Sequence, residues 1–201
     1  MDEVRQSAYR ATANTIIKKL ERRNMTGHHC ATAAEAVELA LELVPHDASV
    51  TWGGSVTFGE SGVKAALANA GCRMIDRAAA TTPEEQEEMW RNQVSADWFF
   101  MSTNAITVDG ELVNIDGNAN RLSLLLHGPK HVCVIAGMNK VVADVESGIK
   151  RIRTVSCPLN AATPRVNSRE FAPNAMRKAA CAAKRSSRAI RATTTVSTSF
   201  S

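Results

Sequence analysis

The apolar positions along this chain follow two periods, one typical of helices and one typical of buried strands. A helical period of about 3.6 residues predicts helices over residues 2–23, 32–44, 60–70, 82–93, 120–127 and 142–153. Short β-rich runs stand between them, over residues 27–31, 49–52, 73–76, 97–102, 105–108, 111–115 and 132–136. Strands that alternate with helices predict βαβ units. We therefore expect an α/β fold with a mostly parallel sheet flanked by helices.

Several local signals sharpen this pattern. Thr32 is followed three residues later by Glu35, the spacing of a capping box that starts a helix. Asp109 and Gly110 lie between two β-branched runs, which is a strong signal for a β-hairpin. The run over residues 132–136 is apolar without alternation, as expected for a strand buried on both faces of a sheet.

The chain divides by pattern and charge into three parts. Residues 1–24 are expected to form an N-terminal helix packed on the domain, and residues 25–160 one α/β domain. Residues 161–201 lose the periodic pattern and are rich in Thr, Ser and Arg, so we expect a loose tail. The net charge is +4, but the residues from Arg165 onward carry eight Lys or Arg and one Glu, so the remaining body is mildly acidic.

A basic tail can bind nucleic acid. Here it contains almost no aromatic residue and no nucleic-acid motif. We therefore favour a solvated segment over a nucleic-acid partner. No apolar run approaches the roughly 18–20 residues of a membrane span, and the first ten residues lack the apolar core of a secretory signal, which predicts a cytoplasmic protein.

The cysteine pattern argues against a metal or redox centre within the chain. Five cysteines are widely spaced and form no CxxC pair, at positions Cys30, Cys72, Cys133, Cys157 and Cys181. This spacing disfavours a disulfide scaffold and a self-contained zinc or iron–sulfur site. Burial as small hydrophobic side chains is the favoured interpretation, and we predict no metal or cofactor in this chain.

Two loops that follow predicted strands are candidates for binding an anion. The first contains Gly53 and Gly54, whose backbone allows close approach of N–H groups, with the hydroxyls of Ser55 and Thr57 beside them. Glycines after a strand are also ordinary turn residues, so this signal alone does not specify a ligand. The sequence is neither GxGxxG nor a phosphate-binding P-loop.

The second loop is unusually rich in short polar residues. The predicted binding residues in it are Asn104, Asn114, Asp116, Gly117, Asn120 and Arg121. Such residues stabilise tight turns and helix caps, and that structural interpretation is kept open. The functional interpretation is a polar cradle in which Arg121 holds a carboxylate or phosphate.

A third segment follows the buried strand at residues 132–136. Gly137 and Lys140 there are predicted to contribute to the same crevice, although Lys140 is equally compatible with an exposed position before the next helix. Glu60 and Asp116 are the two weak candidates for a catalytic carboxylate. A carboxylate at either position is also common as a helix N-terminal residue or cap.

At these loops the sequence resembles the LUD (lactate utilisation) domain family. The likeness lies in the WGGS segment at 52–55 and in the segments at residues 102–107, 109–117, 128–130 and 136–142. It runs from about residue 11 to residue 158 without large gaps, and the motifs are specific only together. The resemblance implies a fold like that of the ribose-5-phosphate isomerase, glucosamine-phosphate deaminase and CoA-transferase group.

The resemblance also implies a bacterial or archaeal role in lactate utilisation, beside iron–sulfur partner proteins that oxidise L-lactate to pyruvate. Similar short proteins carry a cysteine-rich C-terminal segment, whereas residues 176–196 here keep Cys181 alone. One cysteine cannot hold a four-cysteine cluster, so any iron–sulfur centre is expected in partners.

Three hypotheses follow from the sequence. The favoured one is a subunit of, or accessory to, an L-lactate-oxidising system that binds a small anionic ligand or partner subunits. The alternative is a stand-alone enzyme of the isomerase or CoA-transferase type, acting on a sugar phosphate or acyl-CoA. The third and weakest is a nucleic-acid-associated protein that uses the basic tail.

Overall fold

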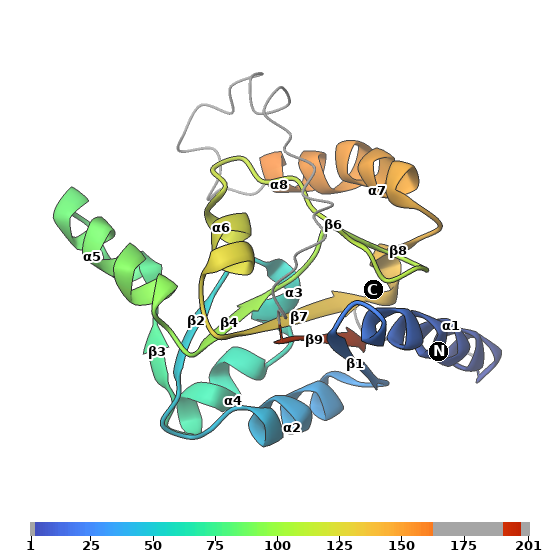
Figure 1. Ribbon diagram of the computed structural model, residues 1–201, viewed down its shortest axis with the longest axis horizontal. Coiled ribbons are helices and arrows are strands. Elements are labelled where there is room, and N and C mark those ends of the chain that lie inside the picture. The colour runs from blue at the N-terminus through green and yellow to red at the C-terminus, as the bar shows by residue number, and fades with distance from the viewer. Residues whose placement is uncertain (1–2, 163–190, 198–201) are drawn as a thin grey trace.

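A computed structural model describes residues 3–162 and 191–197 of the chain, and it confirms the α/β fold class (Figure 1). Its helices are α1 (Glu3–Glu21), α2 (Ala33–Leu43), α3 (Val56–Glu60), α4 (Val63–Asn69), α5 (Pro83–Val94), α6 (Asn120–His127), α7 (Val145–Arg151) and α8 (Cys157–Ala162). Its strands are β1 (Met25–Cys30), β2 (Ser49–Trp52), β3 (Arg73–Ile75), β4 (Trp98–Met101), β5 (Ala105–Thr107), β6 (Leu112–Val113), β7 (His131–Gly137), β8 (Val141–Val142) and β9 (Arg191–Ser197). Short 3₁₀ turns η1 (Arg77–Ala79) and η2 (Met138–Lys140) and a π-helical turn η3 (Ile152–Ser156) complete the described elements.

Six strands form one parallel sheet in the order β1-β9-β7-β4-β2-β3. A second, three-stranded sheet has the order β6-β5-β8 and contains the antiparallel hairpin of β5 and β6. The hairpin predicted at Asp109-Gly110 is confirmed, and Gly110 adopts a φ of 77°, which favours glycine. No helix in the described part of the chain is long and apolar enough to cross a bilayer.

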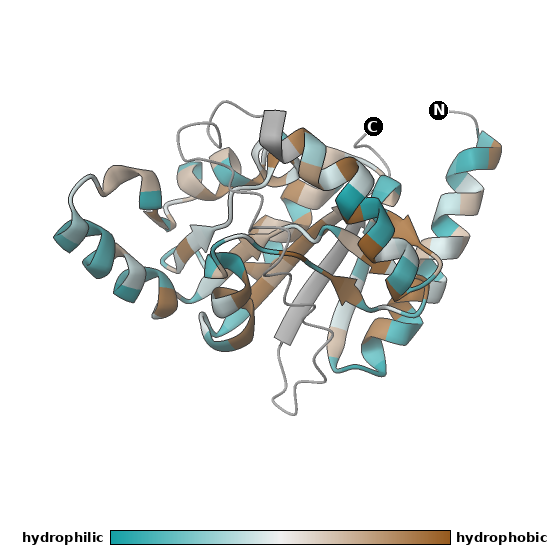
Figure 2. Ribbon diagram, turned by 90° about the horizontal axis from the view of Figure 1, so that it is seen from above, coloured by the Kyte–Doolittle hydropathy of each residue, from teal (hydrophilic) through white to brown (hydrophobic). Residues whose placement is uncertain are grey.

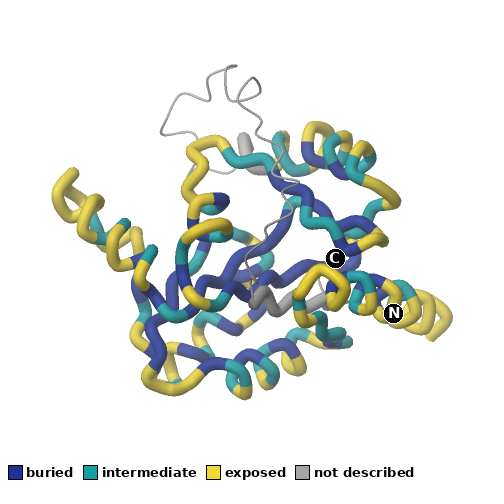
Figure 3. The backbone as a smooth tube through the Cα atoms, in the orientation of Figure 1, coloured by how far each residue is buried: buried dark blue, intermediate teal, exposed yellow. Residues whose placement is uncertain are grey.

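The large sheet is buried on both faces, as the unalternating strands predict. Figure 1 shows α2 and α4 on one side of it and α6 on the other. Along β4, Trp98 and Phe100 pack toward α2 and α4, whereas Phe99 and Met101 pack toward α6. Hydrophobic residues are concentrated in the central strands β4 and β7, which are almost entirely buried. Figure 2 and Figure 3 show this hydrophobic, buried centre of the molecule.

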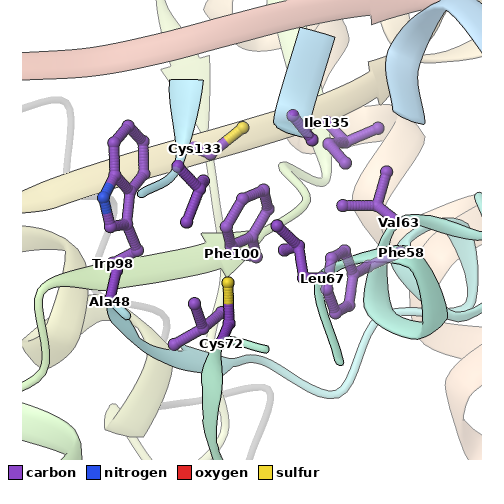
Figure 4. Close-up of a cluster of buried hydrophobic side chains, with 12 residues drawn as sticks. Ala48, Phe58, Val63, Leu67, Cys72, Trp98, Phe100, Cys133 and Ile135 are labelled. Atoms are coloured by element: carbon purple, nitrogen blue, oxygen red, sulfur yellow. The ribbon is translucent and has the colours of Figure 1, made fainter. Parts of the chain in front are cut away.

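The larger core cluster contains stacked aromatic rings. Phe58 from α3 stacks on Phe100 with ring centroids 5.4 Å apart, and Leu67 from α4 closes the cluster beside them (Figure 4). Burial of each such side chain contributes about 1.5–3 kcal/mol. Because Phe58 lies in α3, this packing also fixes the position of the helix that follows the glycine loop.

The N-terminal helix packs where the two sheets meet. Ile16 and Leu20 of α1 are fully buried against Ile106 of β5. On β1, a Cβ at Gly27 would lie 2.8 Å from the side chain of Ile17, so the close contact between α1 and β1 depends on the missing side chain. The predicted boundaries at residues 24 and 160 stay predictions.

The C-terminal segment differs from the sequence-based expectation. Residues 191–197 form β9, which pairs in parallel with β1 on one side and with β7 on the other. The prediction of a loose tail is therefore wrong for these residues, while residues 163–190 and 198–201 lie outside the described residues. The run RATTTVS contains β-branched residues that favour strands, but its polar composition gives no sign of a strand between two others.

Two other boundaries differ. The predicted helix over residues 60–70 is divided, because α3 ends at Glu60 and α4 begins at Val63. α3 itself begins at Val56, within the segment expected to be a loop. The helix predicted from Val142 begins at Val145, because Asp144 caps it and Val142 belongs to β8. In both places a side-chain cap sets the start, with Ser55 accepting from the Phe58 N–H and Asp144 from the Ser147 N–H.

The position of β9 can be tested by removing one backbone donor. Thr194 pairs with Gly27 on one side and with Val134 on the other. Thr194→Pro should lower the free energy of unfolding by about 3 kcal/mol or more, because proline removes an N–H within a central strand. Thr194→Ala keeps the N–H and is the matched control in urea unfolding. Equal stability of the two variants would contradict a central β9.

The amino ends of β2 and β4 are joined by Asp97. Its Oδ2 accepts hydrogen bonds from the Ser49 backbone N–H at 3.1 Å and from the Ser49 hydroxyl at 2.6 Å. Lys130 donates to Oδ1 at 3.2 Å. These bonds, led by those from Ser49, lower the pKa of Asp97 from 3.8 to about 2.

The lowered pKa predicts a pH-dependent contribution to stability. The carboxylate of Asp97 stabilises the fold above the unfolded-state pKa near 3.8 and loses this effect as the pH falls toward 2. Asp97→Asn should lower the free energy of unfolding at pH 7 by about 1 kcal/mol, a modest value because the side chain is 38% exposed. The difference from the parent should narrow below about pH 4. Glu88→Gln, on exposed α5, should show neither effect.

Candidate functional site

The candidate site lies where β2, β4 and β7 end, because parallel strands bring their carboxyl ends to one edge of the sheet. The glycine loop follows β2, Ser102 follows β4 and Lys140 follows β7 within η2. These three segments are far apart in sequence, and hydrogen bonds join them into one cluster of side chains.

The glycine loop positions α3. The Gly53 N–H donates to the Phe100 carbonyl at 2.9 Å, and the Ser55 N–H donates to the Gly53 carbonyl at the same distance. Ser55 also caps α3 through its hydroxyl. The loop therefore holds Thr57, the second residue of α3, where it contacts Lys140 after the end of β7. A binding role for the Gly53, Gly54 and Ser55 backbone stays a prediction.

Asn104 is the hub of the cluster. Its backbone N–H donates to Asn114 Oδ1 at 3.1 Å, and its own Oδ1 accepts from the Ile115 N–H at 3.1 Å. The same Oδ1 accepts from Arg121 Nη2 at 2.9 Å, and its carbonyl oxygen accepts from Arg151 Nη1 at 2.7 Å. Asn104 thereby fixes the β5–β6 hairpin and two guanidinium groups at once.

Arg121 is fixed by backbone oxygens and one carboxylate. Besides Asn104, it donates to the Ser102 and Ile115 carbonyls at 3.3 and 3.1 Å. Its Nε lies 3.7 Å from Asp116 Oδ2. Burial lowers the pKa of Arg121, and the charge of Asp116 opposes that shift.

Asp116 acts mainly as a helix cap. Its Oδ2 accepts from the backbone N–H groups of Arg121 and Leu122 at 3.1 and 3.3 Å, at the start of α6. The capping interpretation of Asp116 is therefore confirmed. Its role as a catalytic carboxylate stays a prediction.

Lys140 lies among hydroxyl groups. Its Nζ donates to Ser102 Oγ at 2.5 Å and to Thr57 Oγ1 at 2.9 Å. Burial, followed by the charges of Arg151 and Arg121, lowers the pKa of Lys140 from 10.5 to about 8. Of the two positions that the sequence leaves open for Lys140, the structure places it in the cluster.

The three cationic side chains of the cluster are not neutralised by an equal number of carboxylates. Lys140, Arg121 and Arg151 are all anchored to the segment from Ser102 to Asn104. Within residues 3–162 and 191–197, the only carboxylate paired with any of the three cations belongs to Asp116. The arrangement is suited to holding an anion.

The remaining predicted residues contribute less directly. The side chain of Glu60 is exposed and forms no hydrogen bond or ion pair with described residues, so its catalytic role stays a prediction. Gly117 and Asn120 are exposed beside the cap of α6, and Gly137 is buried at the end of β7. A shallow depression along α7, between Asp144 and Thr154, shares no residue with the cluster.

Two members of the cluster were missed by the candidate set drawn from the sequence. Ser102 directly follows a buried strand and precedes Asn104, so its position at a strand end was an available signal. Arg151 lies 47 residues from Asn104, at the junction of α7 and the π-helical turn η3. No local pattern in the sequence relates it to the loop that it contacts.

The cysteines that the structure describes do not form a ligand set. Cys30, Cys72 and Cys133 are buried as separate core side chains, and burial raises the pKa of Cys30 to about 11. No three His, Cys, Asp or Glu side chains among the described residues gather as metal ligands. These residues therefore do not fit an iron–sulfur cluster, and Cys181 lies outside the described residues.

The role of Asn104 as hub predicts a stability effect. Asn104→Ala removes the Oδ1 atom that accepts from the Ile115 N–H and from Arg121 Nη2. It should lower the free energy of unfolding by about 2 kcal/mol, because it leaves these two donors without their acceptor. Asn120→Ala changes the same type of side chain at the exposed first residue of α6 and should stay within about 0.5 kcal/mol of the parent. Urea unfolding followed by circular dichroism measures both. Similar free energies of unfolding for the two variants would contradict the central role of Asn104 in the cluster.

Comparison with known proteins bears on the fold and the family of the chain. No curated protein matches the chain. Among solved structures, the chain is similar to the crystal structure of a DUF162 family protein from Deinococcus radiodurans. The TM-score is 0.57 with 10% sequence identity, over 94% of this chain and 98% of the other, so this likeness concerns the fold. The LUD domain model matches residues 13–196, which includes β9 up to Val196. The chain therefore belongs to the LUD domain family.

Proposed function

We propose that this protein binds a small anionic carboxylate at the cluster of Lys140, Arg121 and Arg151, as a subunit of or accessory to an L-lactate-oxidising system. Membership of the LUD domain family supports a role related to lactate utilisation. The observation that carries the proposal is the uncompensated positive charge beside the carboxyl ends of β2, β4 and β7. The cytoplasmic, bacterial or archaeal setting and the iron–sulfur partner subunits belong to the same proposal.

Arg151 is the cation best placed to meet a ligand. Its Nε donates to the Asn139 carbonyl, and its Nη1 donates to the Asn104 carbonyl and to Ser156 Oγ. Its Nη2 has no hydrogen-bond partner within the part of the chain that the structure describes. A carboxylate at Nη2 would gain a charge-assisted hydrogen bond without displacing an existing one.

The alternative enzyme of the isomerase or CoA-transferase type has less support. It relies on fold analogy, which does not specify chemistry. It also needs a free carboxylate, whereas Asp116 is used as a cap and Glu60 is exposed without described partners. A sugar phosphate or acyl-CoA nevertheless makes a discriminating ligand in the binding experiment.

Ligand binding should raise the thermal stability of the purified protein. At about 100 times its Kd, a ligand stabilises the folded state by roughly 2.7 kcal/mol, or about 5–10 °C for a domain of this size. We expect L-lactate or pyruvate to produce this shift. Arg151→Met should weaken it, while Lys150→Met, at the neighbouring exposed position, should not.

The affinity should also depend on pH through Lys140. Its ammonium group is charged below the pKa of about 8 and neutral above it. Carboxylate binding, measured by calorimetry, should therefore weaken about tenfold from about pH 7 to about pH 9.5. Lys140→Met should bind weakly at both pH values.

The thermal-stability measurement also separates the two candidate functions. A rise in melting temperature with sugar phosphate or acyl-CoA alone would favour the alternative enzyme. No rise with any of these anions would refute the anion site.

A further inference from the structure

Lys140 differs from the two arginines of the cluster in its chemistry. An arginine stays protonated at any physiological pH, whereas a lysine that loses its proton becomes a nucleophilic amine. For anion binding alone a third guanidinium would serve equally well. A lysine at this position therefore offers a function that an arginine lacks, namely a nucleophilic amine.

The surroundings of Nζ favour the neutral amine. Its two described partners, Thr57 Oγ1 and Ser102 Oγ, are neutral oxygens, so neither contributes a negative charge that would hold the proton. The charged groups that act on it are Arg151 of α7 and Arg121 of α6, and both disfavour the ammonium. Among the residues that the structure describes, no ion pair joins Lys140 to a carboxylate, and the carboxylate of Asp116 pairs with Arg121.

This environment produces a substantial population of nucleophile. With a pKa of about 8, about a quarter of Lys140 is neutral at pH 7.5, against about one part in a thousand for an ordinary lysine. Desolvation and neighbouring cations are the two means by which enzymes activate such an amine. Lys140 is a residue of intermediate burial, and its Nζ lies at the carboxyl edge of the sheet, where open α/β sheets bind their ligands.

The partner of this amine must carry a carbonyl group next to an anion. Arg151 and Lys140 are held at the two ends of one short segment, through the Asn104 carbonyl and the Ser102 hydroxyl. In a 2-oxo acid the carboxylate is bonded directly to the carbonyl carbon. A carboxylate on Arg151 would thus bring the adjacent carbonyl into the cluster that also holds Lys140.

We propose that Lys140 forms a covalent imine with the carbonyl carbon of a 2-oxo acid whose carboxylate is held by Arg151. This inference rests on the proposed anion site and names its substrate class. Nζ attacks the carbonyl carbon, the C=O π electrons move to oxygen, and that oxygen takes the proton lost by nitrogen, giving a carbinolamine. The nitrogen lone pair then expels the hydroxyl, which leaves as water after protonation, and a C=N bond replaces C=O. No oxidant or reductant is consumed.

The two hydroxyls have a definite place in this step. Ser102 and Thr57 lie within hydrogen-bond distance of Nζ and can pass a proton between nitrogen and the departing oxygen. They act on the proton and form no bond to carbon. Ser102→Ala should therefore slow imine formation more than it weakens binding of the 2-oxo acid.

The experiment is reductive trapping on the full-length protein. Pyruvate and sodium borohydride are added together, and intact-mass spectrometry should show a gain equal to pyruvic acid less one oxygen atom. Peptide mapping should place the adduct on Lys140, with at least about tenfold higher occupancy than on exposed Lys150, because its neutral fraction is larger. With pyruvate kept saturating at every pH, so that weaker binding does not limit the reaction, the trapped yield should rise with pH, with its midpoint near 8. Because the parent protein itself locates the lysine, the result does not depend on a variant that folds.

Variants and binding data separate the possible outcomes. Lys140→Arg should abolish the adduct, and Lys150→Arg should leave it unchanged. Pyruvate binding without any adduct, or an adduct spread evenly over exposed lysines, would overturn the imine while leaving the anion site intact. Absence of both binding and adduct would overturn the proposed function itself.

Discussion

The segment from Ser102 to Asn104 holds three cationic side chains that would otherwise repel one another. Lys140 bonds to the Ser102 hydroxyl, Arg121 to the Ser102 carbonyl and the Asn104 side chain, and Arg151 to the Asn104 carbonyl. Burying like charges together is costly unless hydrogen bonds compensate them. The backbone and amide oxygens at the end of β4 supply much of that compensation, so the site depends on the exact course of the chain there.

The fold provides this course through its central strands. β4 is buried on both faces, with β7 on one side and β2 on the other, so its carboxyl end has little freedom. The Asn104 N–H donates to the Asn114 side chain, and the Asn104 side chain accepts from the Ile115 N–H. These two bonds hold the chain where it turns into the β5–β6 hairpin. A rigid edge of this kind suits a site whose cations must keep their positions before a ligand arrives.

Much of the architecture follows from the sequence alone. The alternation of apolar strands with capped helices, the hairpin at Asp109-Gly110 and the loops at the ends of β2, β4 and β7 all appear where local pattern predicts them. Side-chain caps and turn residues act over three or four positions, so their consequences are visible in the sequence. The same holds for Asn104, Asn114 and Arg121, whose types and spacing indicated a polar cradle.

The tertiary structure decided what depends on distant contacts. A Thr-rich run without an apolar stripe became β9, because backbone pairing with both β1 and β7 outweighs its polar composition. Arg151 joined the site only because α7 packs beside the hairpin, 47 residues along the chain from Asn104. The lowered pKa of Lys140 likewise arises from burial and from two arginines on other helices. The sequence determined which groups were present, whereas the fold determined which of them share one low-dielectric space, since electrostatic coupling depends on distance in space.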